Sequence, residues 1–222
     1  MVAMTDVPIR VLVADDHAIV REGIRHVLLQ EPGFEIVAEA ATGDEALAQA
    51  LAIRPDVAVL DITMPGQSGL EVATALHDQL PDARVLILSM HDNPEYVLEA
   101  VRAGAHAYLL KDSAATELRA AVRAVHEGEA YYSPPIAGKL SEAVRGELES
   151  TQRAQALDAL TTREREVLVG IVQGQTNKEI AAGLGISHRT VETHRESVMR
   201  KLRIRTVAGL TRFAMEVGLG KA

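Results

Sequence analysis

One short stretch, residues 56–66, constrains the fold of this chain more than any other. A run of four apolar residues, Val57 to Leu60, stops abruptly at Asp61, and Pro65-Gly66 follows soon after. Such a run is typical of a strand buried on both faces, and the Pro-Gly pair predicts a turn. In open parallel α/β sheets ligands bind at the carboxyl ends of the strands, so Asp61 is the first candidate for a functional residue.

The first half of the chain repeats this pattern. Further strands are predicted at residues 9–14, 34–40, 84–89 and 107–110, and they alternate with helices at residues 17–29, 42–53, 70–80, 94–103 and 114–127. Five strands that alternate with five helices predict an α/β fold with a doubly wound, five-stranded parallel sheet.

Polar residues stand at the carboxyl ends of four of these strands. Right-handed crossovers place those ends on one edge of the sheet, where the following residues should meet: Asp15, Asp16, Asp61, Ser89 and Lys111. Asp16, Asp61 and the backbone carbonyl of Thr63 can bind Mg²⁺, with Asp15 acting through its charge and bound water. Lys111 and Ser89 can contact a phosphoryl group. Because phosphoryl transfer needs positioning and charge neutralisation, this set predicts that Asp61 is phosphorylated.

The last third of the chain is predicted to be helical. Residues 129–156 carry Pro134-Pro135 and weak periodicity, so we expect a linker with one short helix at about residues 136–149. Beyond it, Thr161 and Glu164 form a capping box that opens a helix ending at Gly174. Helices at residues 177–184 and 188–202, joined by the short turn at Gly185, predict a helix-turn-helix.

The second helix of this motif carries residues suited to reading DNA. Val191, Val198 and Leu202 mark its buried face, and polar residues occupy the opposite face, which fits the major groove. With a lysine of the preceding helix, the expected DNA contacts are Lys178, Arg189, Thr190, Glu192, Thr193, Glu196, Arg200 and Lys201.

The two halves of the chain also differ in net charge. Residues 1–132 hold 9 basic and 21 acidic residues, a net charge of −12, whereas residues 133–222 hold 14 and 10, a net charge of +4. An acidic half suits a cation-binding carboxylate cluster, and a basic half suits a polyanion such as DNA.

The composition excludes several other kinds of site. The chain has no cysteine, which removes disulfides, thiol catalysis and thiolate metal sites. It also lacks an apolar run near the ~20 residues of a membrane-spanning helix. We therefore expect a cytoplasmic protein with no membrane partner.

The residues of the first half together resemble the receiver domain of bacterial two-component response regulators, over residues 8–128. The resemblance rests on Asp15-Asp16, Asp61 followed by Met64-Pro65-Gly66, Ser89, Tyr108 and Lys111. It implies that Asp61 takes a phosphoryl group from a partner histidine kinase, that Ser89 shifts toward the phosphate and that Tyr108 rotates inward. Many receivers have proline after the lysine, with a cis bond before it, and this chain has Asp112 there instead.

Residues 157–220 resemble the LuxR-type helix-turn-helix, and the whole chain thereby resembles the NarL/FixJ family of response regulators. The matching residues are Leu160-Thr161, the run Thr190-Val191-Glu192-Thr193-His194 and Lys201-Leu202. The resemblance implies a sequence-specific transcription regulator that is no enzyme and that forms a homodimer when phosphorylated or bound to DNA. Glu192 and Glu196 stand where some relatives have lysines, so the preferred DNA sequence should differ.

Two other functions remain open at this point. The first half can serve as a phosphate-independent dimerisation module for the DNA-binding half. Alternatively, Asp61 can be the nucleophile of a phosphatase, but enzymes of that kind use a second acid two residues after the nucleophile, and this chain has Thr63 there.

Overall fold

The computed structural model describes residues 7–113 and 115–219 of the chain. The chain divides into two compact units, Met1–Val144 and Arg145–Ala222, which we call the first unit and the second unit.

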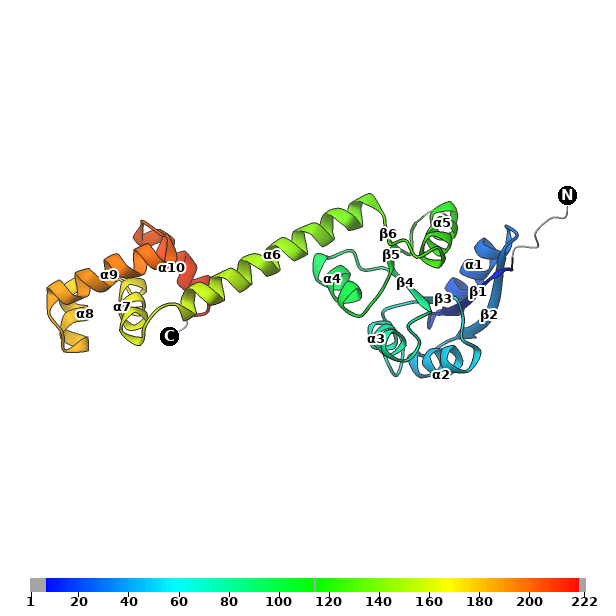
Figure 1. The fold of residues 1–222 in the computed structure, drawn as a ribbon, viewed down its shortest axis with the longest axis horizontal. Coiled ribbons are helices and arrows are strands. Elements are labelled where there is room, and N and C mark those ends of the chain that lie inside the picture. Colours follow the sequence, from blue (N-terminus) through cyan, green and yellow to red (C-terminus); the bar gives the residue numbers. More distant parts are fainter. Residues whose placement is uncertain (1–6, 114, 220–222) are drawn as a thin grey trace. The chain divides into compact units, whose positions relative to one another are not determined.

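The first unit is built on a parallel sheet. Its strands are β1 (Ile9–Ala14), β2 (Phe34–Ala40), β3 (Val57–Leu60), β4 (Arg84–Ser89), β5 (Ala107–Leu110) and β6 (Tyr131–Tyr132). They lie in the order β2-β1-β3-β4-β5-β6, and every neighbouring pair is parallel. Each crossover from strand to strand passes through a helix, so the carboxyl ends of the strands share one edge (Figure 1).

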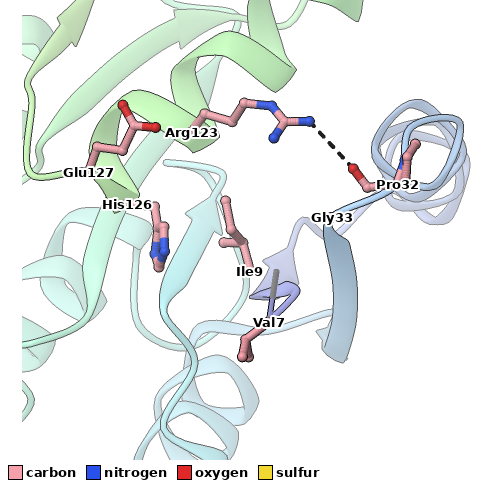
Figure 2. Close-up of a pocket in the computed structure, with 7 residues that line it drawn as sticks. All are labelled: Val7, Ile9, Pro32, Gly33, Arg123, His126 and Glu127. Carbon is pink, nitrogen blue, oxygen red and sulfur yellow. Dashed lines mark hydrogen bonds between the residues drawn. The ribbon is translucent and has the colours of Figure 1, made fainter. Parts of the chain in front are cut away.

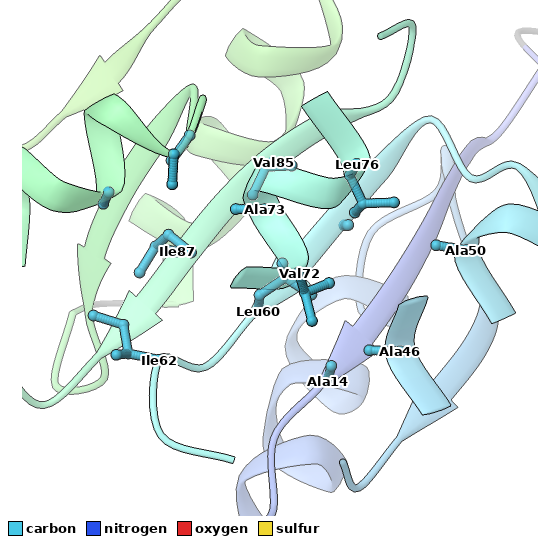
Figure 3. Close-up of a cluster of buried hydrophobic side chains, with 14 of the residues drawn as sticks. Ala14, Ala46, Ala50, Leu60, Ile62, Val72, Ala73, Leu76, Val85 and Ile87 are labelled. Carbon is cyan, nitrogen blue, oxygen red and sulfur yellow. The ribbon is translucent and has the colours of Figure 1, made fainter. Parts of the chain in front are cut away.

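Helices cover both faces of the sheet (Figure 1). They are α1 (Ala18–Leu29), α2 (Gly43–Ile53), α3 (Gly69–Gln79), α4 (Pro94–Arg102) and α5 (Ala115–His126). One core cluster joins the sheet to α2, α3 and α4, and Figure 3 shows Ala46 of α2 near Ala14 of β1 and Val72 of α3 near Leu60 of β3. A second cluster joins the other face to α1 and α5. Burial of β3 on both faces explains its continuous apolar run.

The structure confirms the doubly wound parallel sheet and adds one strand to the five that the sequence predicts. β6 consists of Tyr131 and Tyr132 alone and pairs with β5. A two-residue strand has no alternating pattern, so its sequence carries no strand signal.

The helix expected at residues 136–149 is longer than predicted. α6 runs from Pro134 to Asp158 without a break. Pro134 and Pro135 occupy its first turn, where an amide N–H has no partner within the helix and a proline is tolerated. Gly138 and Gly146 weaken the apolar periodicity but do not end the helix.

The second unit contains α7 (Thr162–Val172), α8 (Asn177–Leu184), α9 (His188–Leu202) and α10 (Val207–Glu216), packed around one apolar cluster. The capping box of Thr161 and Glu164 is present, and Ser187 caps α9 by accepting a hydrogen bond from the Thr190 amide. Gly185 ends α8 with a φ of 64° and forms the turn before α9. The predicted helix-turn-helix is therefore confirmed. In the part of the chain that the structure describes, no helix is long and apolar enough to cross a membrane.

Candidate functional site

The expected acidic residues meet at the carboxyl edge of the sheet. Asp15 and Asp16 follow β1, Asp61 follows β3 and Lys111 follows β5. The Lys111 ammonium lies 2.6 Å from Oδ2 of Asp15 and 2.8 Å from Oδ2 of Asp61. Asp15 and Asp61 are 1% and 5% exposed, so two carboxylates from separate strands share one ammonium in a buried site.

A histidine extends this cluster. Nδ1 of His17 lies 2.7 Å from Asp16 and 3.3 Å from Asp15, and the His17 amide donates a hydrogen bond of 2.8 Å to Oδ1 of Asp15. One ligand atom each from Asp15, Asp16, His17 and Asp61 lies within 4.8 Å of the others. His17 was not among the site residues expected from the sequence, and it has no metal-ligand spacing to the other histidines. The signal that it joins the site is its position directly after Asp15-Asp16.

The cluster holds more negative charge than the protein neutralises. Burial raises the pKa of Asp61, and Lys111 only partly offsets this because Asp15 adds a like charge. Burial disfavours the charged form of Lys111, but hydrogen bonds to Asp15 and Asp61 outweigh it and raise the pKa of the ammonium.

This donor set fits Mg²⁺. Mg²⁺ prefers oxygen ligands, keeps several waters and is commonly bound by one or two carboxylates together with phosphate oxygens. Asp16 is 31% exposed at its side chain, so it can reach a partly hydrated ion at the surface, and Asp15 belongs to the same cluster of ligand atoms. The Thr63 amide hydrogen bonds to the Asp61 carboxylate, and its carbonyl stays a predicted ligand.

Ser89 and Tyr108 lie next to each other on β4 and β5 and hold the same loop residue. Both are 0% exposed. Ser89 Oγ accepts a hydrogen bond of 3.0 Å from the His91 amide, and the Tyr108 hydroxyl donates one of 2.6 Å to the His91 carbonyl. The Tyr108 ring is already inside the protein, so the inward rotation that the resemblance implies has no outward starting point in this conformation. The Lys111–Asp112 peptide bond is trans, as are all peptide bonds of the described residues.

The pocket in Figure 2 lies at the other edge of the sheet. It is lined at the start of β1 by Val7 and Ile9, before β2 by Pro32 and Gly33, and at the end of α5 by Arg123, His126 and Glu127. Arg123 donates a hydrogen bond of 3.5 Å to the Pro32 carbonyl (Figure 2). None of the residues predicted to take part in phosphoryl transfer lines it, so it is separate from the Asp61 site.

In the second unit, the predicted DNA-contacting residues are exposed. Val191 and Val198 face the core, both 0% exposed, so the opposite face of α9 is free to enter a groove. The exposed residues include Lys178, Arg189, Thr190, Glu192, Thr193, Glu196, Arg200 and Lys201. Glu192 pairs with His188 at 3.6 Å, and Thr193 donates a hydrogen bond to the carbonyl of Arg189.

Lys201 differs from the other basic residues of this face because its ammonium is engaged. It lies 2.7 Å from Oε2 of Glu164, which is only 4% exposed, and 3.1 Å from the carbonyl of Ala159. Glu164 also accepts hydrogen bonds from the Thr161 amide and the Ser197 hydroxyl. Burial opposes the ionisation of Glu164, but the contacts with Lys201, Thr161 and Ser197 outweigh it and lower its pKa to about 2. A DNA contact by Lys201 would have to compete with this pair.

Comparison with known proteins agrees with both units. Residues 11–123 match the model of the response regulator receiver domain, and residues 158–214 match that of the luxR family of bacterial regulatory proteins. The chain is 40% identical over 217 residues to the transcriptional regulatory protein MctR of Rhizobium johnstonii, covering 97% of this chain and 98% of MctR.

Two solved structures are similar over almost the whole chain. The response regulator ChrA of a heme-sensing two-component system is 35% identical, with a TM-score of 0.54, and the match covers 96% of this chain and 98% of ChrA. The response regulator RcsB in complex with DNA is 25% identical, with a TM-score of 0.57, over 95% of this chain and 99% of RcsB.

Proposed function

Because the chain belongs to the two-component response regulators that join a receiver domain to a LuxR-family DNA-binding domain, we propose that it regulates transcription through phosphorylation of Asp61. The observation that carries this proposal is the meeting of Asp15, Asp61 and Lys111 from three strands in one buried site. A cluster that served only to stabilise the fold would match its charges, whereas here three carboxylates, those of Asp15, Asp16 and Asp61, gather around a single ammonium.

The chemistry begins with Asp61 as the nucleophile. A carboxylate oxygen attacks the phosphorus of a phosphohistidine on a partner kinase, the phosphorus–nitrogen bond breaks, and the imidazole leaves with a proton as an acyl phosphate forms. Bound Mg²⁺ supplies positive charge that offsets the phosphoryl oxygens, and Asp15, Asp16 and Asp61 are the residues that would hold it. Lys111, already 2.8 Å from Asp61, is placed to pair with a phosphoryl oxygen once the carboxylate is phosphorylated.

Ser89 is the residue proposed to sense the phosphoryl group. Its hydroxyl is buried at the end of β4, beside the strand that leads to Asp61, and a serine there can donate a hydrogen bond to a phosphoryl oxygen. Tyr108 contacts the same loop residue as Ser89 and would respond to its movement. We assign the switch to these two residues together.

The second unit is proposed to read DNA through α9. Its exposed face presents Arg189, Thr193 and Glu196, and the relative RcsB has been solved as a DNA complex. In a homodimer, two α9 helices would read half-sites about one helical turn, ~34 Å, apart. Glu192 and Glu196 weaken attraction to phosphate and can accept hydrogen bonds from cytosine N4, which favours a sequence preference distinct from that of a lysine-bearing face.

A phosphorylation-dependent DNA titration tests this function. DNA fragments are first selected from genomic DNA with protein treated with acetyl phosphate and Mg²⁺. Their affinity is then measured with and without acetyl phosphate, for the wild type and for Asp61→Ala. We expect tighter binding on treatment of the wild type and no change in Asp61→Ala. Equal affinity in all four cases would favour the alternative, a DNA-binding dimer with a purely structural receiver.

A further inference from the structure

The first turns of α6 are packed onto the first unit. Ile136 is 0% exposed and belongs to the core cluster that contains α3 and α4, and Leu140 packs against the same cluster. Between them in sequence, the Lys139 ammonium forms an ion pair and hydrogen bond with Asp92, in the loop that joins β4 to α4. Figure 1 shows α6 following β6 at the edge of the sheet. The start of α6 is therefore held by one buried apolar contact and one surface ion pair.

The loop that carries Asp92 is also held by the switch residues. His91, the neighbour of Asp92, has its amide bonded to Ser89 and its carbonyl bonded to Tyr108. The His91 ring stacks on Tyr96 of α4, with the ring centroids 4.5 Å apart. Any change in the position of Ser89 therefore acts on the backbone directly before Asp92.

We propose that the Asp92–Lys139 ion pair is a latch that fixes the start of α6 to the first unit and opens when Asp61 is phosphorylated. The inference rests on the function proposed above. When the Ser89 hydroxyl turns toward a phosphoryl oxygen, the His91 amide loses its acceptor, and the β4–α4 loop moves with the carboxylate of Asp92. The contact with Lys139 then breaks.

The chemistry of the pair suits a latch. The Asp92 and Lys139 side chains are 59% and 30% exposed, so water solvates both charges when they separate. An exposed pair contributes little to stability, and breaking it costs far less than breaking a buried one. The hydrogen bond from Lys139 lowers the pKa of Asp92, so the carboxylate is charged at neutral pH.

α6 connects the segment held by this ion pair to the second unit. The helix is continuous from Pro134 to Asp158 and crosses the boundary between the units at Val144. Opening of the pair would leave residues 134–144 held by Ile136 and Leu140, and would so loosen the start of the helix that continues into the second unit.

Hydrogen–deuterium exchange of residues 134–144, measured on the full chain, tests the latch. The variants are Lys139→Ala, the matched control Arg145→Ala, which removes an exposed cation from the same helix, and the charge-reversed double variant Asp92→Lys with Lys139→Asp. Each is measured before and after treatment with acetyl phosphate and Mg²⁺, and intact mass reports the phosphoryl group on Asp61.

We expect Lys139→Ala to speed the exchange of residues 134–144 about threefold without phosphorylation, the size of effect typical of an exposed ion pair. Phosphorylation should speed it in the wild type and in Arg145→Ala, and should add nothing in Lys139→Ala. The double variant should restore slow exchange.

Three results separate the latch from the proposed function. If Asp61 is phosphorylated and exchange at residues 134–144 does not change, the latch is wrong and the function stands. If Lys139→Ala exchanges like the wild type before treatment, the latch is also wrong, whatever phosphorylation does. If the wild type accepts no phosphoryl group, the proposed function fails and the phosphorylation-driven opening fails with it.

Discussion

Each unit of this protein contains a buried carboxylate paired with a lysine, and the two pairs behave in opposite ways. In the second unit, Glu164 is fully satisfied by Lys201, Thr161 and Ser197, and its pKa falls to about 2 although burial opposes ionisation. In the first unit, burial raises the pKa of Asp61, and Lys111, which also pairs with Asp15, only partly offsets this effect. A buried acid with a complete set of donors stabilises a fold, whereas a buried acid that shares its donor is a candidate functional site.

The largest expected effect is the loss of Glu164. Glu164→Ala removes the capping box of α7 and leaves Lys201 and Ser197 without their shared partner, so the second unit should lose about 3 kcal/mol of unfolding free energy. Urea unfolding followed by far-ultraviolet circular dichroism measures this loss.

The tyrosines provide the matched measurement. All four, Tyr96, Tyr108, Tyr131 and Tyr132, lie in the first unit, so tyrosine fluorescence reports that unit alone. The unfolding transition seen by tyrosine fluorescence should not move in Glu164→Ala. The exposed control Glu166→Ala should change the unfolding free energy of neither unit by more than about 0.5 kcal/mol. A Glu164→Ala variant as stable as the wild type would show that the pair does not stabilise the second unit.

Acid should affect the two units with opposite sign. The folded pKa of Glu164, about 2, lies below its ordinary 4.5, so its contribution is present above about pH 4.5 and is lost as the pH falls toward 2. The pKa of Asp61 is raised, so its protonation as the pH falls relieves an unfavourable buried charge and stabilises the first unit. Urea titrations at several pH values should show each dependence flattened in Glu164→Gln and Asp61→Asn respectively. The contrast would be contradicted if Glu164 and Asp61 contributed pH dependences of the same sign to the unfolding free energies of their units.

Mg²⁺ should stabilise only the first unit. At ten times its dissociation constant, an ion that binds only the folded state adds about 1.4 kcal/mol, and the cluster of Asp15, Asp16 and Asp61 is the site expected to take it. Tyrosine fluorescence during thermal unfolding should shift with Mg²⁺ in the wild type and not in Asp16→Asn or Asp61→Asn. A shift that survives both substitutions would place the ion elsewhere.

The smallest effect distinguishes two neighbouring cations of α9. Arg200→Ala should weaken binding to all DNA sequences and lower the salt dependence of the binding constant by about one ion, because Arg200 is exposed and phosphate can displace the long, 3.4 Å hydrogen bond from its guanidinium to Ser197 Oγ. Lys201→Ala should instead destabilise the second unit and leave the salt dependence nearly unchanged, because its ammonium pairs with Glu164.

Lys178→Ala should resemble Arg200→Ala, and Thr193→Ala should alter the preference among DNA sequences. Titrations over several salt concentrations check all four.

The sequence predicted the parts of the fold that depend on local patterns. Apolar runs that end in acids identified the strands, and the rule that parallel strands share a carboxyl edge brought Asp15, Asp61 and Lys111 together before any coordinates. The capping box at Thr161 and the turn at Gly185 located helix boundaries in the second unit. Each of these signals lies within a few residues of the feature that it predicts.

The sequence did not show contacts that depend on distant residues. Glu164 and Lys201 are 37 positions apart, and Lys139 and Asp92 are 47 apart, so no spacing rule links them. The ion pair between Lys201 and Glu164 therefore became visible only in the structure. From the sequence, a lysine at the end of a recognition helix is expected to contact phosphate. β6 was missed because it is two residues long, and α6 was placed too short because the largely polar residues 150–158 carry no clear apolar stripe.

The phosphoryl group on Asp61 is the central claim, and intact mass spectrometry measures it directly. The full chain is incubated with acetyl phosphate, with Mg²⁺ or with a chelator, as the wild type and as Asp61→Ala, and released phosphate is followed in parallel. The account predicts the added mass of one phosphoryl group on the wild type with Mg²⁺, none on Asp61→Ala, and only slow release of phosphate. A wild type that gains no mass, or an Asp61→Ala variant that gains the same mass, would contradict it.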